Sequence, residues 1–348
     1  MDFVKNAWYG AALSSEIGEH LLARRLLGIS LVMYRTSDGR PVALRNSCPH
    51  RGYPLEFGTR RGDTIECGYH GFVFDCNGVC THVPGQRNVP SRADVQAFPT
   101  LEAGPFVWVW MGDPELADPG LLPVDELGFN DPRWRFTAGR VPIRANYELI
   151  VDNLLDLSHE GWIHTSSIGA VEIAETPLEV TVHAERDMVE GYRFMADVPA
   201  PPAFRPYADE RGHIDRTQHF HFWAPTIYML NNRAAKPGAE VAGRQARIIY
   251  LCTPEDERNT HYFYCGGRLN RHDDPAADDE LHARQAALIA EDAAAVERIQ
   301  RRLDAEGPTF EVSVKIDTAG LAGRRLIRQM LERESSGDTS RQLAHTAG

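Results

Sequence analysis

The sequence contains no apolar run near the roughly 18 residues that a helix needs to cross a bilayer. Its longest apolar runs, residues 26–34 and 106–111, have the length of strands. The first residues also lack the basic, apolar and small-residue order of a secretion signal. We therefore expect a cytoplasmic protein whose six cysteines stay reduced. This excludes a disulfide scaffold and favours metal ligands or buried thiols.

Positive charge is also scarce. Lysine and arginine total 37 against 49 aspartates and glutamates, which gives a formal net charge of −12. This balance argues against nucleic acid or an anionic membrane surface as the main partner, because phosphate binding needs a basic surface. Hydrophobic residues at 43% and charged residues at 25% are typical of a folded globular protein, and 348 residues are enough for two domains.

The pattern of strands and prolines predicts two domains. Residues 1–115 are β-rich and contain the hairpin signal Asn77-Gly78. Residues 116–135 are rich in proline, so we expect a linker without regular elements. Residues 136–334 mix strand-like alternation with helices, and the polar residues 335–348 predict a flexible tail. The expected fold class is α+β, with an all-β domain followed by an antiparallel sheet flanked by helices.

Two short segments of the first domain each offer one cysteine and one histidine. Cys48-Pro49-His50 is followed, after sixteen residues, by Cys67-Gly68-Tyr69-His70. A structural zinc site takes two cysteines and two histidines around one ion. A Rieske [2Fe–2S] cluster takes two cysteines on one iron and two histidines on the other. Zinc modules usually gather like ligands into each motif, whereas one of each kind per loop suits two bridged metals. The spacing therefore favours the Rieske cluster over zinc and over chance packing.

This motif, C-x-H-x16-C-x2-H with Arg51-Gly52 and Gly71, resembles the Rieske domain of aromatic-ring oxygenases. It is less similar to the respiratory Rieske proteins, which carry an extra cysteine in each ligand loop and a membrane anchor. Residues 6–9, Asn-Ala-Trp-Tyr, resemble the oxygenase components of vanillate O-demethylases. The resemblance implies a catalytic domain of the helix-grip, START-like fold. It also implies a [2Fe–2S] cluster held by Cys48, His50, Cys67 and His70.

A second group of metal-ligand residues follows the linker. Asp156 and His159 are three residues apart and share one face of a helix expected over residues 145–164. His164 follows His159 by five residues, about 140° around an ideal helix. Both histidines reach one ion only if the helix ends or bends, and Gly161 is the expected place. A lone histidine here would be a packed core residue. The resemblance implies that His159 and His164 bind Fe(II), with Asp156 as a bridging carboxylate.

Two histidines need one carboxylate to complete a facial triad that leaves positions open for O₂ chemistry. The alanine-rich residues 278–303 predict a helix with an apolar stripe at helical spacing, formed by Leu281, Leu288, Ile299 and Leu303. Asp292 falls within that stripe, where a carboxylate is costly to bury unless a cation partners it. The alternative is a partly exposed aspartate beside Glu291. The resemblance places the carboxylate ligand in a late helix of this kind, which favours Asp292.

The resemblance also implies partners. Its members form head-to-tail homotrimers in which the cluster of one subunit faces the iron of its neighbour. A hydrogen bond joins a cluster histidine, here His70, to the bridging carboxylate, here Asp156. Asn153 matches a polar position of the related demethylases and is expected to tune the iron. No G-x-G-x-x-G motif follows a strand, so we expect NADH-derived electrons to arrive through a separate flavin and iron–sulfur reductase.

The predicted function is that of a terminal oxygenase. The resemblance implies that O₂ and NADH-derived electrons are used to hydroxylate a methyl or methoxy group of an aromatic acid. Formaldehyde is released where the methyl group is on oxygen. A ring cis-dihydroxylating dioxygenase is the alternative. A non-catalytic Rieske electron carrier is disfavoured, because a carrier needs no second metal motif.

The residues that contact the substrate are less clearly marked. His219, His221 and Trp223 share one face of a strand-like segment, and either line the pocket or belong to an ordinary amphipathic strand. Arg244 and Arg247 either clamp a substrate carboxylate bidentately or are solvated surface charges, and the second interpretation is favoured. The aromatic acid itself is left open.

Overall fold

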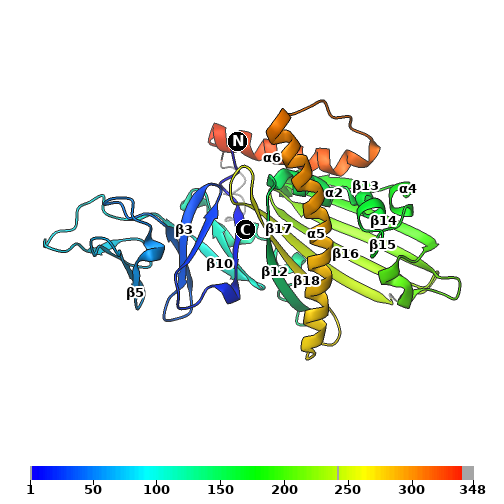
Figure 1. Cartoon of the computed structure of the whole chain (residues 1–348), viewed down its shortest axis with the longest axis horizontal. Helices are drawn as coiled ribbons and strands as arrows, with labels where there is room; N and C mark the ends of the chain where they lie inside the picture. Colours follow the sequence, from blue (N-terminus) through cyan, green and yellow to red (C-terminus); the bar gives the residue numbers. More distant parts are fainter. Residues whose placement is uncertain (1, 241–242, 339–348) are drawn as a thin grey trace. The chain divides into compact units, whose positions relative to one another are not determined.

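The computed structural model describes residues 2–240 and 243–338. The chain divides into two compact units, Met1–Val124 with Glu334–Gly348, and Asp125–Arg333 (Figure 1). The division falls inside the stretch expected as a linker, residues 116–135, whose bounds stay a prediction. Of the expected tail, residues 335 and 336 belong to a helix, and residues 339–348 lie outside the described residues.

The proline-rich stretch contains regular structure, contrary to expectation. Asp113 and Asp118 accept hydrogen bonds from the backbone amides of Glu115 (3.0 Å) and Gly120 (2.8 Å), and each precedes a proline. These caps begin the short 3-10 helices η3 (Pro114–Leu116) and η4 (Pro119–Leu121), which α1 (Val124–Leu127) follows. Proline suits the first helical position because its φ is already helical and its missing N–H would have no partner there.

Unit 1 consists of three antiparallel sheets, which confirms the all-β prediction. Their strand orders are β1-β11-β10, β2-β3-β4-β9 and β5-β6-β7-β8. The strands are β1 (Trp8–Leu13), β2 (Leu22–Leu26), β3 (Ile29–Arg35), β4 (Pro41–Arg45), β5 (Thr59–Arg61), β6 (Thr64–Glu66), β7 (Val73–Phe74), β8 (Cys80–His82), β9 (Ala97–Phe98), β10 (Thr100–Ala103) and β11 (Phe106–Trp110), with 3-10 helices η1 (Ser14–Glu16) and η2 (Leu55–Phe57). The predicted turn at Asn77-Gly78 lies between β7 and β8.

One hydrophobic core of unit 1 extends over the second and third sheets. It contains Tyr34 and Leu44 from the second sheet and Phe74 from the third. Cys48 and Cys67, each 2% exposed, belong to the same core. The packing of these two sheets therefore positions both cysteine loops. All six cysteines are free, as the exclusion of a disulfide scaffold requires.

Unit 2 is built on a seven-stranded antiparallel sheet with the order β12-β18-β17-β16-β15-β14-β13. The strands are β12 (Arg135–Ile143), β13 (Glu179–His183), β14 (Met188–Pro199), β15 (His213–Trp223), β16 (Ile227–Ala235), β17 (Arg244–Pro254) and β18 (Thr260–Arg268). The helices are α2 (Tyr147–Leu155), η5 (Leu157–His159), α3 (Glu160–Ile163), α4 (Glu172–Glu175), η6 (Ala184–Arg186), η7 (Pro202–Tyr207), α5 (Pro275–Glu306), η8 (Lys315–Asp317) and α6 (Thr318–Ser336). A sheet with helices completes the predicted α+β fold class. No helix within the described residues is long and apolar enough to span a membrane.

Helix α5 crosses one face of this sheet (Figure 1) and confirms the helix predicted over residues 278–303. Asp274 caps its first turn by accepting a hydrogen bond from the amide of Ala276 (3.0 Å), and Pro275 occupies the first helical position. Gly307 ends helix α5 with a φ of +76°, a backbone conformation that residues with a side chain rarely adopt. The predicted apolar stripe holds only in part. Ile299 is 44% exposed, because that turn of the helix borders an open cavity and not the sheet.

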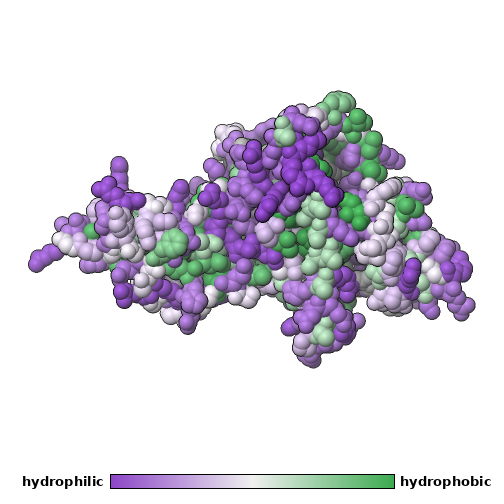
Figure 2. Space-filling view, viewed as in Figure 1, coloured by the Kyte–Doolittle hydropathy of each residue, from purple (hydrophilic) through white to green (hydrophobic). Residues whose placement is uncertain are grey.

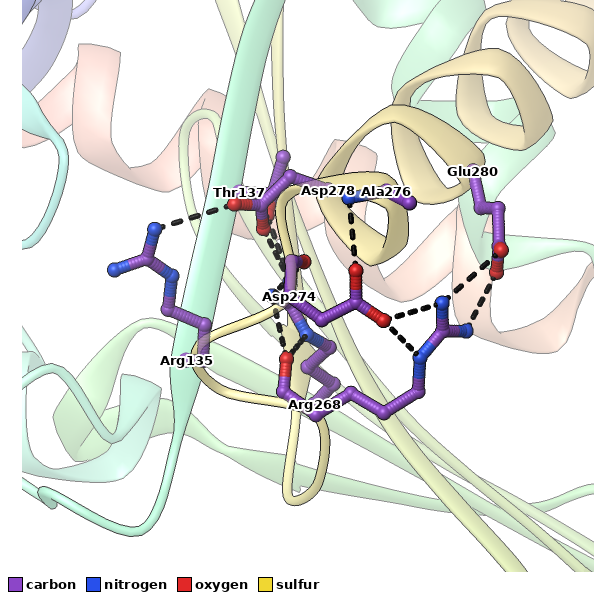
Figure 3. A network of polar contacts seen from close by, with 8 residues as sticks. Arg135, Thr137, Arg268, Asp274, Ala276, Asp278 and Glu280 are labelled. Carbon is purple, nitrogen blue, oxygen red and sulfur yellow. Dashed lines mark hydrogen bonds and ion pairs between the residues drawn. The ribbon is translucent and has the colours of Figure 1, made fainter.

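A network of charged side chains fixes the beginning of α5 to the edge of the sheet (Figure 3). Asp278 bonds Thr137 of β12 and Arg268 of β18, and its second oxygen lies 3.2 Å from Arg135. Nearby, Arg271 donates to Asp274 (2.7 Å) and forms an ion pair with Glu280. The network joins two strands to the helix that carries Asp292.

Candidate metal centres and substrate pocket

The two cysteine–histidine loops of unit 1 are built alike. The amide of Gly52 donates to the carbonyl of Cys48 (2.8 Å), and Gly71 donates to Cys67 (3.0 Å). The amide of each cysteine then donates to the residue five positions on, Tyr53 or Phe72. The two glycines have φ values of +70° and +72°, so the loops turn where a side chain would be strained. The glycines that follow each motif are therefore part of the loop geometry.

These loops separate the two kinds of ligand residue. Cys48 and Cys67 are buried in the core, whereas His50 and His70 are exposed, with ring centroids 4.5 Å apart. Burial, and then the neighbouring Cys67, raise the pKa of Cys48 to about 11. A thiol buried in this way becomes a thiolate beside a metal cation. Thiolates inside and imidazoles outside are the donor set that a Rieske [2Fe–2S] cluster requires.

Unit 2 brings His159, His164 and Asp292 together. The Nε2 atoms of the two histidines lie 3.4 Å and 3.1 Å from Oδ1 of Asp292. The ligand atoms of all three residues lie within 4.8 Å of one another. Three ligands on one face of an octahedral iron, at about 2.2 Å each, would be about 3.1 Å apart. The donor set and its spacing fit a mononuclear iron with open positions.

The helix breaks at Asp156, before both histidines, and not at the predicted Gly161. His159 then ends the 3-10 helix η5, and α3 ends at Ile163, directly before His164. Asp156 has φ −111° and ψ 87°, ends α2, and accepts a hydrogen bond from the amide of Ser158 (2.9 Å). Aspartate competes for backbone amides in this way and favours helix ends over helix interiors. A Cβ on Gly161 would lie 3.0 Å from the carbonyl oxygen of Ala170, so this glycine serves close packing.

The second nitrogen of each histidine is also held. Nδ1 of His159 lies 2.6 Å from the carbonyl oxygen of Asp156, and Nδ1 of His164 lies 2.6 Å from Glu291. Such partners orient the ring and leave Nε2 as the ligand atom. Burial disfavours the charged form of His164, but Asp292 and Glu291 outweigh it and raise its pKa to about 9. Burial raises the pKa of Asp292, yet its hydrogen bonds with His159 and His164 bring it below the ordinary value.

Asn153 and Asp156 occupy different positions beside this site. The side-chain amide of Asn153 donates to Asp292 (3.4 Å). Asp156 lines a second cavity together with His159, and this cavity has an empty volume of about 1280 Å³ including space open to solvent. Asp152 lines the same cavity and is paired with Arg324. The backbone carbonyl of Asp156 contacts Nδ1 of His159, whereas its carboxylate accepts a hydrogen bond from the amide of Ser158.

A buried polar group beneath the site was not anticipated from the sequence. Glu160, which follows His159, accepts hydrogen bonds from Arg216 (2.8 Å) and Gln218 (3.0 Å) of β15. Arg193 of β14 donates to Gln218 (3.3 Å). The alternation of polar and apolar residues along β15 indicates that one face of the strand carries polar groups, but the sequence does not show which face is buried.

A pocket with an empty volume of about 780 Å³, including space open to solvent, opens beside His159, His164 and Asp292. Its walls are mainly apolar, with Leu154, Leu157, Phe204, Leu230, Ile248 and Leu288 among them. Asn232, Arg247 and Arg284 add polar groups. Apolar walls with a few placed polar groups are typical of a site for a small organic molecule.

Arg247 is part of this pocket, and its interpretation as a solvated surface charge is wrong. Its Nε donates to Asn231 (3.0 Å), and its guanidinium lies 4.8 Å from the ring centroid of Trp134. Burial lowers the pKa of Arg247, which shows that its charge is partly removed from water. Strand β17 includes Arg244, but the side chain of Arg244 lies outside the described residues.

His219, His221 and Trp223 are not among the residues that line this pocket, which favours the interpretation of an ordinary amphipathic strand over that of substrate contacts. Successive residues of a strand point to opposite faces. Arg216 and Gln218 of β15 point to the face that carries Glu160, and the three predicted residues point to the other. There, His219 and His221 meet Glu190 of β14. The strand is therefore amphipathic, and the three predicted residues lie on its outer face, which is the face opposite Glu160.

Comparison with known proteins agrees with both halves of the chain. Residues 7–99 match the Rieske [2Fe-2S] domain, and residues 143–333 match the vanillate O-demethylase oxygenase C-terminal domain. The vanillate O-demethylase oxygenase subunit of Pseudomonas sp. (strain HR199 / DSM 7063) is 35% identical over 99% of each chain. An iron–sulfur subunit of a toluene-4-sulfonate monooxygenase from Comamonas testosteroni is 32% identical, over 96% of this chain and 99% of its own. A crystal structure of dicamba monooxygenase bound to dicamba superimposes with a TM-score of 0.87 at 32% identity, over 97% of this chain and 100% of that one.

Proposed function

The chain belongs to the Rieske non-heme iron oxygenases, in the group of the vanillate O-demethylase oxygenase subunits, and we propose that it hydroxylates a methyl or methoxy carbon of an aromatic acid. The observation that carries the proposal is the position of Arg247 in an apolar pocket that also contains His159, His164 and Asp292. A cation and a metal site in one apolar pocket suit a flat substrate with a carboxylate at one end and a carbon to be oxidised at the other.

We assign the [2Fe–2S] cluster to Cys48, His50, Cys67 and His70, and Fe(II) to His159, His164 and Asp292. The cluster and the iron, when bound, supply the electron transfer and O₂ activation that no amino-acid side chain provides. The chain itself keeps Nε2 of each iron histidine available through the contacts of its Nδ1. It also seats the thiols away from water and leaves His50 and His70 at the surface, where an electron partner can reach them.

The overall reaction consumes O₂, two electrons and two protons, and gives one hydroxyl group and one water. A hydroxylated methoxy carbon is a hemiacetal, which releases formaldehyde and leaves a phenol. A hydroxylated ring methyl group remains as an alcohol. Relatives of the chain are named for vanillate, dicamba and toluene-4-sulfonate, which supports an acidic aromatic substrate.

The electrons come in this proposal from NADH through a separate reductase, as the description of relatives as oxygenase components or subunits implies. We place the protein in the cytoplasm, where NADH is available to such a reductase. Arg247 would bind the substrate carboxylate, with its guanidinium held in place by Asn231 and Trp134.

We also propose a head-to-tail homotrimer in which His70 of one subunit approaches Asp156 of the next. Near the cluster of unit 1, Phe57 and Tyr69 are 65% and 60% exposed. In unit 2, Trp162 and Phe310 are 65% and 91% exposed, and Figure 2 shows hydrophobic atoms along the segment that joins α5 to α6. Large exposed apolar side chains of this kind favour a protein interface. They support a contact that covers both metal sites.

The test is turnover of a series of methoxy- and methyl-substituted aromatic acids with NADH, a reductase and O₂. We expect formaldehyde from methoxy acids or a benzylic alcohol from methyl acids, in proportion to the NADH consumed. Arg247→Gln should raise KM for the acid by roughly 10- to 100-fold, the scale of a lost charged hydrogen bond, and should leave KM for its methyl ester unchanged. Arg233→Gln is the matched control, because Arg233 is exposed on the neighbouring strand β16. A cis-diol product would show ring dihydroxylation and contradict the proposal.

A further inference from the structure

The outer face of the sheet of unit 2 carries a cluster of three histidines and one glutamate that the oxygenase reaction does not use. His183 lies on β13, Glu190 on β14, and His219 and His221 on β15. The pairing of the strands places His221 directly opposite Glu190 and His183 one diagonal position away. The two strands that flank β14 therefore direct imidazoles toward its carboxylate. From this arrangement we propose that Glu190, His219 and His221 bind a divalent transition-metal ion of the zinc class.

The distances among the ligand atoms support this assignment. Oε1 of Glu190 lies 2.7 Å from Nε2 of His219 and 3.7 Å from Nε2 of His221, and the ligand atoms of all three residues lie within 4.8 Å of one another. A tetrahedral ion with bonds of about 2.1 Å places neighbouring ligand atoms about 3.4 Å apart. The observed distances lie on either side of this value, so small side-chain rotations complete the site.

His221 is the residue that hydrogen bonding within the cluster leaves unexplained. Its Nε2 is beyond hydrogen-bond reach of Glu190, and its buried Nδ1 has no hydrogen-bond partner among the described residues. The side chain is nevertheless only 19% exposed. The unpartnered atom is Nδ1, so a metal ion at Nε2 would engage this largely buried imidazole through its other nitrogen.

His183 completes the arrangement from the other side of the carboxylate. Its Nε2 lies 2.9 Å from Oε2 of Glu190, the oxygen that does not face His219. A partner in this position orients the carboxylate and increases ligand affinity, as is common around metal sites. Three protein ligands leave a fourth position for water. Imidazole and carboxylate ligands suit zinc, copper and nickel better than the magnesium or calcium that all-oxygen sites take.

The site is independent of the proposed iron site. Its residues point to the face of the sheet opposite Glu160, as the alternation along β15 requires, and they do not line the pocket beside His159. An ion there would join β14 to β15 and stabilise the sheet, because binding to the folded state alone raises its stability. The proposal therefore holds or fails separately from the proposed oxygenase function.

The experiment is equilibrium dialysis of the untagged, iron-loaded full-length protein against Zn²⁺, with zinc and iron counted by mass spectrometry. We expect one zinc per chain in addition to the iron, together with a higher Tm. The variants Glu190→Gln and His221→Asn should lower zinc affinity by at least about tenfold, the scale on which even the supporting partners of metal ligands act. They should also lose the rise in Tm. Glu190→Gln keeps the shape of the side chain, so the test does not depend on a truncated residue.

Two controls separate this site from others. His213→Asn removes a histidine from the same face of β15 whose imidazole contacts Asp197, so zinc binding should be unchanged. His159→Ala should reduce iron and leave the additional zinc in place. The proposal is overturned if no additional zinc binds in a large molar excess, if Glu190→Gln and His221→Asn retain it, or if zinc enters only as iron leaves.

Discussion

Arg216 donates a hydrogen bond of 2.8 Å to Glu160, and their side chains are 1% and 4% exposed. Gln218 satisfies the other carboxylate oxygen at 3.0 Å, and the second guanidinium branch donates to the carbonyl of Ile168 (2.9 Å). Because Glu160 follows His159 along the chain, this pair fixes the segment that carries the iron histidines to the floor of the sheet. A buried carboxylate is tolerated here because its charge and both oxygens are matched.

Removal of one partner of the Arg216–Glu160 pair should therefore strongly destabilise the fold. Arg216→Met leaves the carboxylate of Glu160 buried without its cation, which we expect to lower the free energy of unfolding by about 3–5 kcal/mol. Urea unfolding measures this change, and iron content should fall with it while the visible absorption of the cluster is kept. Arg211→Met is the control, because its exposed pairs with Asp197 and Asp209 should contribute at most about 1 kcal/mol. Equal effects of the two substitutions would contradict the role of the buried pair.

The motifs that form the two metal sites were predictable from the sequence, because each depends on a few residues that are close together in the chain. The two cysteine–histidine loops need a turn with positive φ, and Gly52 and Gly71 mark it. Asp292 was found because a carboxylate within an apolar helical stripe demands a partner. A break near the histidines was also expected, but its place was wrong: Asp156, which precedes both, makes the backbone contacts that end α2, whereas Gly161 lies inside α3.

The residues of the pocket were not predictable in the same way. On a strand such as β15 the sequence gives the alternation but not which of the two faces meets the helices, and a shift by one residue exchanges the faces. The three aromatic and histidine side chains were therefore assigned to the pocket, whereas Arg216 and Gln218 point to that side. Arg247 was a candidate carboxylate clamp, but the surface interpretation was favoured, because its burial depends on Trp134, which lies far away in the sequence.

Two substitutions at the proposed iron site should weaken iron binding to different extents. Asp292→Ala removes the carboxylate that lies 3.1 Å from His164 and 3.4 Å from His159, so mononuclear iron should be lost while the cluster spectrum stays intact. Glu291→Gln removes only the charge beside Nδ1 of His164 and should weaken iron binding by roughly 10- to 100-fold. Titration of each variant with Fe(II) measures the two affinities. Full iron loading of Asp292→Ala would mean that another carboxylate completes the triad.

Electron transfer between subunits provides a second prediction. Asp156 lines an open cavity and does not contact the three ligand atoms, so Asp156→Asn should retain both the cluster and the iron. Turnover should nevertheless fall by roughly tenfold to a hundredfold, because the carboxylate is proposed to bind His70 of the neighbouring subunit. Oxidation of the reduced cluster in a single turnover measures the step directly. Asp317→Asn, a substitution in the same cavity, should leave the rate unchanged. Near-normal turnover of Asp156→Asn would refute the coupling.

The network at the beginning of α5 predicts how stability depends on pH (Figure 3). Burial tends to raise the pKa of Asp278, but hydrogen bonds from Arg268, Thr137 and Arg135 outweigh it and hold that pKa well below its ordinary value. The folded state therefore binds a proton at Asp278 less readily than the unfolded state does. The resulting stabilisation is fully present above the unfolded pKa of about 3.9 and is lost as the pH falls toward the folded value.

Asp278→Asn removes this stabilisation and should lower the free energy of unfolding by about 1.5–3 kcal/mol at pH 7, the range for hydrogen bonds to charged groups. The difference from the wild type should shrink as the pH falls from about 4 toward the folded pKa of Asp278, because the unfolded wild-type chain then binds a proton that the folded state does not. Urea unfolding at a series of pH values measures both quantities. Asp279→Asn changes an exposed neighbour and should have little effect at any pH. If the difference between Asp278→Asn and the wild type stays constant down to acidic pH, the stabilisation does not come from the charge of Asp278.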